Sequence, residues 1–273
     1  MRPVRLAASV LAALLAVSAG GAPARAAAPE YYLAVGDSLS VGAQPGKGPT
    51  DEGYTDDLYA ALRKKHPDLK LVKLGCGGET TTTMLKGGIC TYPEGSQVGA
   101  AEAFLKKHAG AVRYVTLNIG ANNTGCMLDG DIACGLTGMA ALVAELPQIA
   151  SRLRAAGGDG PAYAAMTYYD PGLASWVTGG AGQAVAVASV PVVDVFNTWE
   201  QAVYLLNGYK VADVNAAFST HDFTTKATVA PYGTIPLNVA RICTWTYQCT
   251  DNDGHATPAG YQRIADTFEH VFS

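Results

Sequence analysis

Short apolar runs alternate along the chain with longer segments in which apolar residues recur every three or four positions. The short runs, each typical of a buried strand, cover residues 31–35, 69–74, 112–119, 162–168 and 210–214. The periodic segments, each typical of an amphipathic helix, cover residues 54–66, 139–153, 192–206 and 257–272. Because strands and helices alternate, the pattern predicts a parallel sheet covered by helices on both faces.

Prolines and capping residues set the expected ends of these helices. Pro67 should end the first helix, and Pro147 should kink or divide the second. Thr257 is placed to cap the last helix, with Pro258 at its first position. The inner face of the 192–206 helix is expected to hold Val192, Phe196, Trp199, Val203 and Leu206.

Residues 1–26 have the pattern of a secretory signal peptide. Arg2 and Arg5 form a basic start, an apolar run follows over residues 6–17, and Ala24-Arg25-Ala26 supplies small residues beside a cleavage point. The apolar run is shorter than the roughly 20 residues that span a bilayer. We therefore expect cleavage after Ala26 and a secreted protein without an integral membrane segment. The remaining residues, 27–273, are within the range of a single large domain.

The chain is acidic. Its net charge is -4, and loss of residues 1–26 with their three arginines lowers it to -7. Because nucleic-acid binding rests on Lys and Arg that neutralise phosphates, no nucleic-acid partner is expected.

The cysteines all lie in the expected mature chain: Cys76, Cys90, Cys126, Cys134, Cys243 and Cys249. Their even number in an exported chain favours disulfides. The sequence does not fix the pairing, but pairing of nearest neighbours is the simplest expectation, because short loops cost the least entropy to close. Zinc is the alternative ligand, but no CxxC or HExxH spacing occurs, so no metal is expected.

Glycine and polar residues follow three of the predicted strands at the point where each ends. The blocks are Gly36-Asp37-Ser38-Leu39-Ser40, Gly75-Cys76-Gly77-Gly78-Glu79-Thr80 and Gly120-Ala121-Asn122-Asn123. A fourth block, Asp251-Asn252-Asp253-Gly254-His255, precedes the last helix. Taken singly, each block is also typical of an ordinary turn or cap. Because ligands bind beyond the carboxyl ends of parallel strands, the strand-end blocks are expected to lie together at one edge of the sheet.

In this order, the blocks resemble the GDSL family of ester hydrolases, also called SGNH hydrolases, over nearly all of residues 31–272. The resemblance implies a three-layer α/β/α fold with a flavodoxin-like parallel sheet. It also implies a serine carboxylic ester hydrolase, of the esterase or lipase type, that forms an acyl-serine intermediate. The family's nucleophile falls on Ser38 and its base on His255. Its oxyanion hole falls on the backbone N–H groups of Ser38 and Gly78 and on the side chain of Asn122.

These roles suit the chemistry of ester hydrolysis. A serine hydroxyl becomes an effective nucleophile when an imidazole takes its proton, and hydrogen-bond donors stabilise the charge that develops on the carbonyl oxygen. This reaction needs only side-chain and backbone groups, so no cofactor is implied.

The chain departs from the family pattern before the histidine and after Asn122. Where the family has an aspartate three residues before the base, this chain has Asn252. Asp253, Asp251 or a backbone carbonyl is then left to orient His255, and these alternatives stay open. Asn123 also replaces the family's usual aspartate, so altered support for Asn122 is expected. His221, beside Asp222, is a second candidate base should its loop fold toward Ser38.

Different functions remain compatible with the sequence. The leading expectation is a monomer that hydrolyses a lipid-like or simple acyl ester. The aromatic stretch from Tyr168 to Trp176, with Tyr204, suits an acyl groove or stacking on sugars, so a carbohydrate acetyl esterase is the alternative. Asn252 motivates a second alternative, a secreted binding protein that has lost catalysis, because fold does not guarantee activity.

Overall fold

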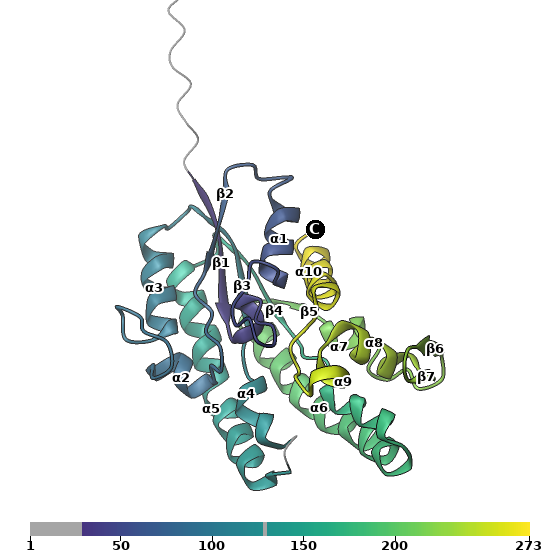
Figure 1. Ribbon diagram of the computed structural model, residues 1–273. Coiled ribbons are helices and arrows are strands. Elements are labelled where there is room, and N and C mark those ends of the chain that lie inside the picture. The colour runs from purple at the N-terminus through teal and green to yellow at the C-terminus, as the bar shows by residue number, and fades with distance from the viewer. Residues whose placement is uncertain (1–28, 128–129) are drawn as a thin grey trace, which may run out of the picture.

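The computed structural model describes residues 29–127 and 130–273 of the chain (Figure 1). The expected signal peptide lies outside these described residues. A five-stranded parallel sheet forms the centre, in the order β2-β1-β3-β4-β5. The strands are β1 (Glu30–Gly36), β2 (Leu69–Lys73), β3 (Val112–Asn118), β4 (Ala162–Met166) and β5 (Lys210–Ala212). This is the strand order of flavodoxin-like sheets, so the predicted fold class is confirmed.

Helices cover both faces of the sheet (Figure 1). On one face lie α1 (Tyr54–Leu62) and α10 (Pro258–Phe272), and on the other lie α3 (Gln97–Lys107), α5 (Ile132–Gly157) and α6 (Gly180–Leu206). As predicted, Pro258 begins α10 and the Thr257 hydroxyl caps it by accepting from the Gly260 N–H.

The shorter elements lie in the connections. They are η1 (Ser38–Val41), α2 (Thr81–Lys86), α4 (Ala121–Thr124), η2 (Gly125–Met127), η3 (Pro171–Thr178), α7 (Val214–Ala217), β6 (Lys226–Val229), β7 (Gly233–Pro236), α8 (Leu237–Trp245) and α9 (Gln248–Asp251). The last strand pair, β6 and β7, forms a separate antiparallel hairpin.

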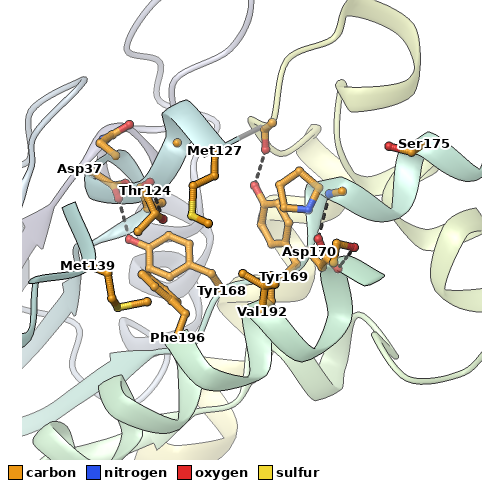
Figure 2. A pocket seen from close by; sticks show the side chains of 18 of the residues that line it. Asp37, Thr124, Met127, Met139, Tyr168, Tyr169, Asp170, Ser175, Val192 and Phe196 are labelled. Atoms are coloured by element: carbon orange, nitrogen blue, oxygen red, sulfur yellow. Dashed lines mark hydrogen bonds between the residues drawn. The ribbon is translucent and has the colours of Figure 1, made fainter. Parts of the chain in front are cut away.

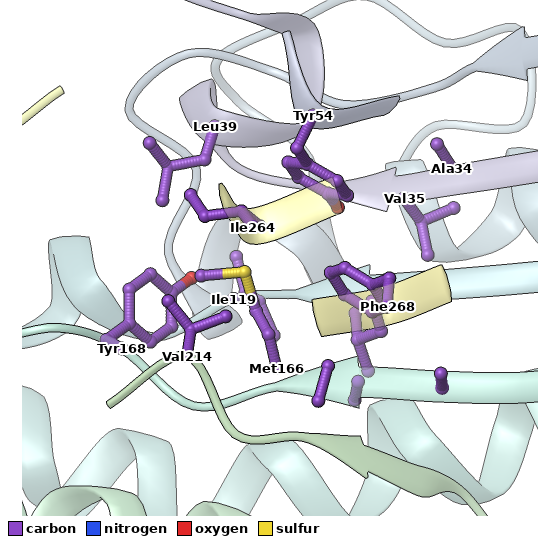
Figure 3. Close-up of a cluster of buried hydrophobic side chains, with 14 of the residues drawn as sticks. Ala34, Val35, Leu39, Tyr54, Ile119, Met166, Tyr168, Val214, Ile264 and Phe268 are labelled. Atoms are coloured by element: carbon purple, nitrogen blue, oxygen red, sulfur yellow. The ribbon is translucent and has the colours of Figure 1, made fainter. Parts of the chain in front are cut away.

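The main core extends over both faces of the sheet, and Figure 3 shows the part of it beside α10. Phe268 of α10 is fully buried and stacks on Tyr54 of α1, with the ring centroids 5.1 Å apart. Val35 of β1 and Ile119, which follows β3, are also fully buried. Because these two residues directly precede the loops that carry Ser38 and Asn122, core packing fixes the backbone from which both loops start.

The two longest helices run through prolines. Helix α5 continues through Pro147 and α6 through Pro191, so the division expected at Pro147 is wrong. A proline inside a helix removes one backbone hydrogen bond. Leu146 and Ile149, on either side of Pro147, are fully buried, and their packing against the core offsets that loss.

The buried face of α6 also differs from the prediction. Val192 and Leu206 are 49% and 86% exposed. The buried positions are Gly182, Ala186, Val190, Phe196, Asn197, Glu200, Val203 and Tyr204. Phe196 and Val203 are buried as predicted. Asn197 and Glu200 share the buried face, and because they are polar, apolar periodicity alone does not identify them.

Three disulfides join nearest neighbours along the chain: Cys76–Cys90, Cys126–Cys134 and Cys243–Cys249. The predicted pairing is confirmed. The first two link the loops after β2 and β3 to the segments that follow them, so they tie down two of the loops at the carboxyl edge of the sheet.

Helix α5 is long and apolar enough to cross a membrane, and it is the only such helix in the described part of the chain. Its residues Leu142, Leu146, Ile149, Ala150 and Leu153 are fully buried in the core. This half of the helix therefore has the packing of a core helix in a globular protein.

Candidate active site

A cavity of about 560 Å³ opens at the carboxyl edge of the sheet (Figure 2). Ser38, Asn122 and His255 all line it. They come from three separate segments: the turn after β1, the turn after β3, and the loop before α10. The structure thus brings three of the predicted site residues to one cavity.

The turn after β1 places Ser38 at the first position of η1. Asp37 caps this short helix, and its carboxylate accepts from the Leu39 N–H over 2.9 Å. Gly36 has φ +151°, and a Cβ there would lie 2.3 Å from the Asn118 carbonyl oxygen. Only glycine fits where β1 lies this close to β3, and its conformation directs the chain into the turn that carries Ser38.

Asp37 is almost fully buried and lies at the centre of a hydrogen-bond network. Its two carboxylate oxygens accept from Asn118 Nδ2 and from the Tyr168 hydroxyl, each over 2.6 Å. Figure 2 shows the bond from Tyr168. Burial raises the pKa of Asp37 to about 6, although these donors and the nearby His255 oppose the shift. The network fixes the backbone on which Ser38 sits.

Gln97 joins the first two loops. Its side chain accepts from the Gly36 N–H over 2.6 Å and donates to the Gly36 carbonyl and to Glu79, each over 3.0 Å. Gly78 precedes Glu79 and has φ +77°, a conformation that favours glycine. Gly78 is not among the described residues that line the cavity.

The third loop lies against the second. Asn122 Nδ2 donates to the Glu79 carbonyl over 2.9 Å, and the Asn122 side chain also lines the cavity. Asn123 is buried, accepts from the Thr81 N–H over 2.9 Å and donates to the Thr81 hydroxyl over 2.7 Å. Asn123 therefore holds the start of α2 beside the turn that presents Asn122.

The loop before α10 holds His255 against a carboxylate. His255 Nδ1 lies 2.5 Å from Asp253 Oδ1, and the His255 backbone N–H donates to the same oxygen over 2.8 Å. With Nδ1–H donating, Nε2 is the nitrogen that can accept a proton. The Tyr169 hydroxyl donates to the Gly254 carbonyl over 2.5 Å. This bond also holds the loop against the segment that precedes η3.

Of the groups that the sequence left open, the structure places Asp253 on the ring. The exposed Asp251 accepts from the Thr250 hydroxyl, and Asn252 accepts from Gln248. His255 therefore has a carboxylate partner although Asn252 occupies the family's aspartate position.

His221 lies away from the cavity that holds Ser38. Its ring is 3.0 Å from Asp194, and it lines a different, shallow cavity together with Asp222. The structure does not bring this second candidate base to Ser38.

Most of the cavity wall is apolar. Figure 2 shows Met127, Met139, Tyr168, Val192 and Phe196 around the opening. The expectation that Trp176 and Tyr204 line the groove is wrong. Trp176 packs against Phe223, with ring centroids 5.6 Å apart, and Tyr204 is fully buried in the core.

A second buried carboxyl lies below the cavity. Glu200 of α6 is fully buried, and neither carboxyl oxygen has a hydrogen-bond partner among the described residues. Burial, together with the charge of the nearby Asp37, raises the pKa of Glu200 well above its ordinary value. Its Oε1 would lie 2.8 Å from a Cβ at Gly120, which places it directly under the turn of Asn122.

Sequence patterns did not identify the residues that hold the loops together. Gln97, Asn118, Tyr168 and Glu200 lie outside the strand-end blocks. Position was one available signal, since Asn118 is the last residue of β3 and Tyr168 lies two residues beyond β4. Tyr168 also begins the aromatic stretch that was expected to line a groove, and it does line the cavity.

Comparison with known proteins identifies the family of the chain. Residues 34–263 match the GDSL-like Lipase/Acylhydrolase family. The chain belongs to this family. The resemblance drawn from the strand-end blocks is therefore confirmed at the level of the family.

Solved structures of low sequence identity share the fold. A putative GDSL-like lipase from Parabacteroides merdae is 14% identical, with a TM-score of 0.57 over 89% of this chain and 94% of that one. The acetylxylan esterase Axe2 from Geobacillus stearothermophilus is 14% identical, with a TM-score of 0.56 over the same shares of the two chains, 89% and 94%. No curated protein gives a significant match. At this identity, the GDSL-like relatives establish the fold and not the substrate.

Proposed function

We propose that the protein is a secreted serine carboxylic ester hydrolase in which Ser38 attacks the ester carbonyl. His255 Nε2 takes the proton from the Ser38 hydroxyl as the new O–C bond forms, and returns it to the leaving alcohol when the acyl-serine forms. Water then attacks the acyl-serine by the same route, which releases the acid and restores Ser38. Asp253 holds the ring in the required tautomer and stabilises the imidazolium that forms.

The proposed oxyanion hole consists of the Ser38 and Gly78 N–H groups and Asn122 Nδ2. An amide nitrogen carries two hydrogens, and the bond to the Glu79 carbonyl uses one of those on Asn122. The other hydrogen is left to stabilise the oxyanion. This anchoring is useful, because donors that are already oriented need not reorganise when charge develops.

The observation that carries the proposal is the shared cavity of Ser38, Asn122 and His255, with Asp253 on the ring. A fluorophosphonate probe tests it, because the probe labels only a serine whose hydroxyl is activated. We expect the wild-type protein to be labelled and Ser38→Ala not to be. Failure of the folded wild-type protein to react would contradict the proposal.

The wall of the cavity favours an apolar acyl group over an acetyl group on a sugar. Met127, Met139 and Phe196 provide apolar contact surface, whereas a sugar-binding groove requires polar partners for hydroxyl groups. We expect kcat/KM for nitrophenyl esters to rise about two- to fourfold per methylene from acetyl to about octanoyl, since each buried methylene contributes about 0.8 kcal/mol. Preference for acetyl esters, with release of acetate from acetylated xylan, would instead identify a carbohydrate esterase.

The disulfides support an extracellular location. Disulfides persist in oxidising compartments and are rare in the cytosol. Cys76–Cys90 and Cys126–Cys134 both flank the proposed site, so the site's loops depend on oxidised cysteines. Export of the protein is therefore part of the proposal.

Asp37→Asn is expected to shift stability in a pH-dependent way. The native pKa of Asp37, about 6, lies above its ordinary value of 3.8, so the unfolded chain releases this proton first as pH rises. The buried carboxylate therefore costs nothing below about pH 4 and destabilises the native state by about 3 kcal/mol above pH 6. Between pH 4 and pH 7, the unfolding free energy of Asp37→Asn relative to wild type should rise by about that amount. Urea unfolding at the two pH values measures it, and a constant difference would contradict the assignment.

A further inference from the structure

The N-terminal halves of α5 and α6 present apolar side chains to solvent on both sides of the cavity mouth. The two helices begin beyond the carboxyl edge of the sheet and diverge there (Figure 1). The exposed side chains, here called the apolar rim, are Ile132 (55% exposed), Leu136 (63%), Val185 (54%), Val192 (49%) and Val195 (67%).

The apolar rim is continuous with the wall of the cavity. Ile132, Val185 and Val192 are half exposed and at the same time line the cavity. On α5, Leu136 lies one turn after Ile132, and on α6, Val195 lies one turn after Val192, so each pair forms an apolar stripe on one side of its helix. At these three residues the apolar wall of the cavity passes directly into the exposed surface.

Charge is missing from these two segments. Residues 132–144 of α5 and 180–193 of α6 contain no Asp, Glu, Lys or Arg. The charged residues directly beside them are Asp131, Glu145 and Asp194, which are all acidic. The whole chain has a net charge of -4. An anionic surface would repel such a protein, and the rim offers no cation to attract one.

We propose that the apolar rim docks the enzyme on the neutral, zwitterionic surface of a lipid aggregate, with the cavity mouth facing the lipid. This docking proposal rests on the proposed function. An acyl ester held in a lipid layer must enter the cavity through the mouth that faces the lipid. Binding follows from burial of apolar area, so it requires no counter-charge and persists at high salt.

A second copy of the chain fits the apolar rim less well. The rim consists of two separate helix faces on either side of an opening, and a symmetric dimer through it would cover the cavity mouth. A lipid surface is deformable and covers both helix faces while it supplies substrate to the opening.

Sedimentation with phosphatidylcholine vesicles tests the docking without any need for activity, when the Ser38→Ala protein is used. We expect it to bind these vesicles, to bind equally in 0.1 M and 1 M salt, and to bind vesicles containing phosphatidylserine no more tightly. In the same background, Leu136→Glu with Val195→Glu should lower the partition coefficient at least about tenfold. Leu206→Glu is the matched control, because Leu206 is an 86% exposed apolar residue at the opposite end of α6.

Several outcomes would overturn the docking. They are Ser38→Ala protein that stays in the supernatant, loss of binding in Leu206→Glu equal to that in the rim variant, or a dimer in analytical ultracentrifugation that the rim variant dissociates. Turnover of a water-soluble butyryl ester tests the proposed function separately. The rim variant with Ser38 intact should match wild type on that ester, because Leu136 and Val195 do not line the cavity. If the wild-type protein hydrolyses no ester, the function fails, while vesicle binding still decides the docking.

Discussion

Replacing Ser38 by alanine is expected to lower kcat/KM for a soluble acyl ester by about 10⁴-fold or more, while the thermal midpoint stays unchanged. The oxygen of this hydroxyl would form the covalent bond to the acyl group, so no other group can substitute for it. Ser38 is only half buried, and among the described residues no hydrogen bond holds its side chain. Its loss therefore leaves no buried partner unsatisfied.

Other serines in and near the cavity provide matched controls. Ser189 lines the same cavity, but its hydroxyl donates to Asp170 over 2.6 Å, and its hydrogen-bond partners among the described residues do not include a histidine. Ser40, two residues after Ser38, is fully buried and donates to the Asp37 carbonyl over 2.7 Å. We expect Ser189→Ala to retain activity within about tenfold and Ser40→Ala to lose about 1 kcal/mol of stability. If Ser189→Ala were as inactive as Ser38→Ala, the nucleophile would not be assigned to Ser38.

The placement of the site at the sheet edge could be predicted because strand ends carry strong local signals. Gly36 and Gly120 end buried apolar runs, and both have a positive φ that favours glycine. A Cβ would also meet the Asn118 backbone at Gly36 and the Glu200 side chain at Gly120. The alternation of elements then places their loops at one edge. For the same reason, the cap at Thr257 and the helix after it could be predicted, since capping depends on neighbouring residues alone.

Helix α6 shows why the rest could not be predicted. Asn197 of this helix donates to the Tyr168 carbonyl and accepts from the Tyr168 N–H, each over 2.8 Å, so it takes the place of a neighbouring strand. Strand β4 ends at Met166, where its pairing with β5 also ends, instead of at the predicted residue 168. A polar residue buried for this purpose is invisible to a pattern that looks for apolar faces.

The group that orients His255 also could not be predicted from the sequence. Asp251 and Asp253 are chemically equivalent in the sequence, and only the path of the loop decides between them. Asn252 adopts φ +51°, a left-handed conformation that asparagine tolerates better than most residues. After this residue the chain turns, and Asp253 lies against the ring while Asp251 remains exposed.

His255→Ala should lower kcat/KM about as much as Ser38→Ala does, by about 10⁴-fold or more, because the two groups act in one step. Asp253→Ala should cost about 10²- to 10⁴-fold, since it removes both the ring's hydrogen bond and the charge opposite the imidazolium. Asp253→Asn should cost less than Asp253→Ala. A single carboxylate oxygen accepts from both the ring and the backbone N–H of His255, and an amide oxygen can accept both bonds without the charge.

Asp251→Ala is the control that completes this series, with an expected activity within about twofold of wild type. Its carboxylate accepts from Thr250, a surface contact that does not reach the ring. Steady-state rates on one soluble ester at pH 8 for all four variants measure the order. Should Asp251→Ala and Asp253→Ala lose the same activity, the loop would be sensitive to any change of charge and Asp253 would have no particular role. Should neither lose activity, a backbone carbonyl would have to orient the ring, which was the third group that the sequence left open.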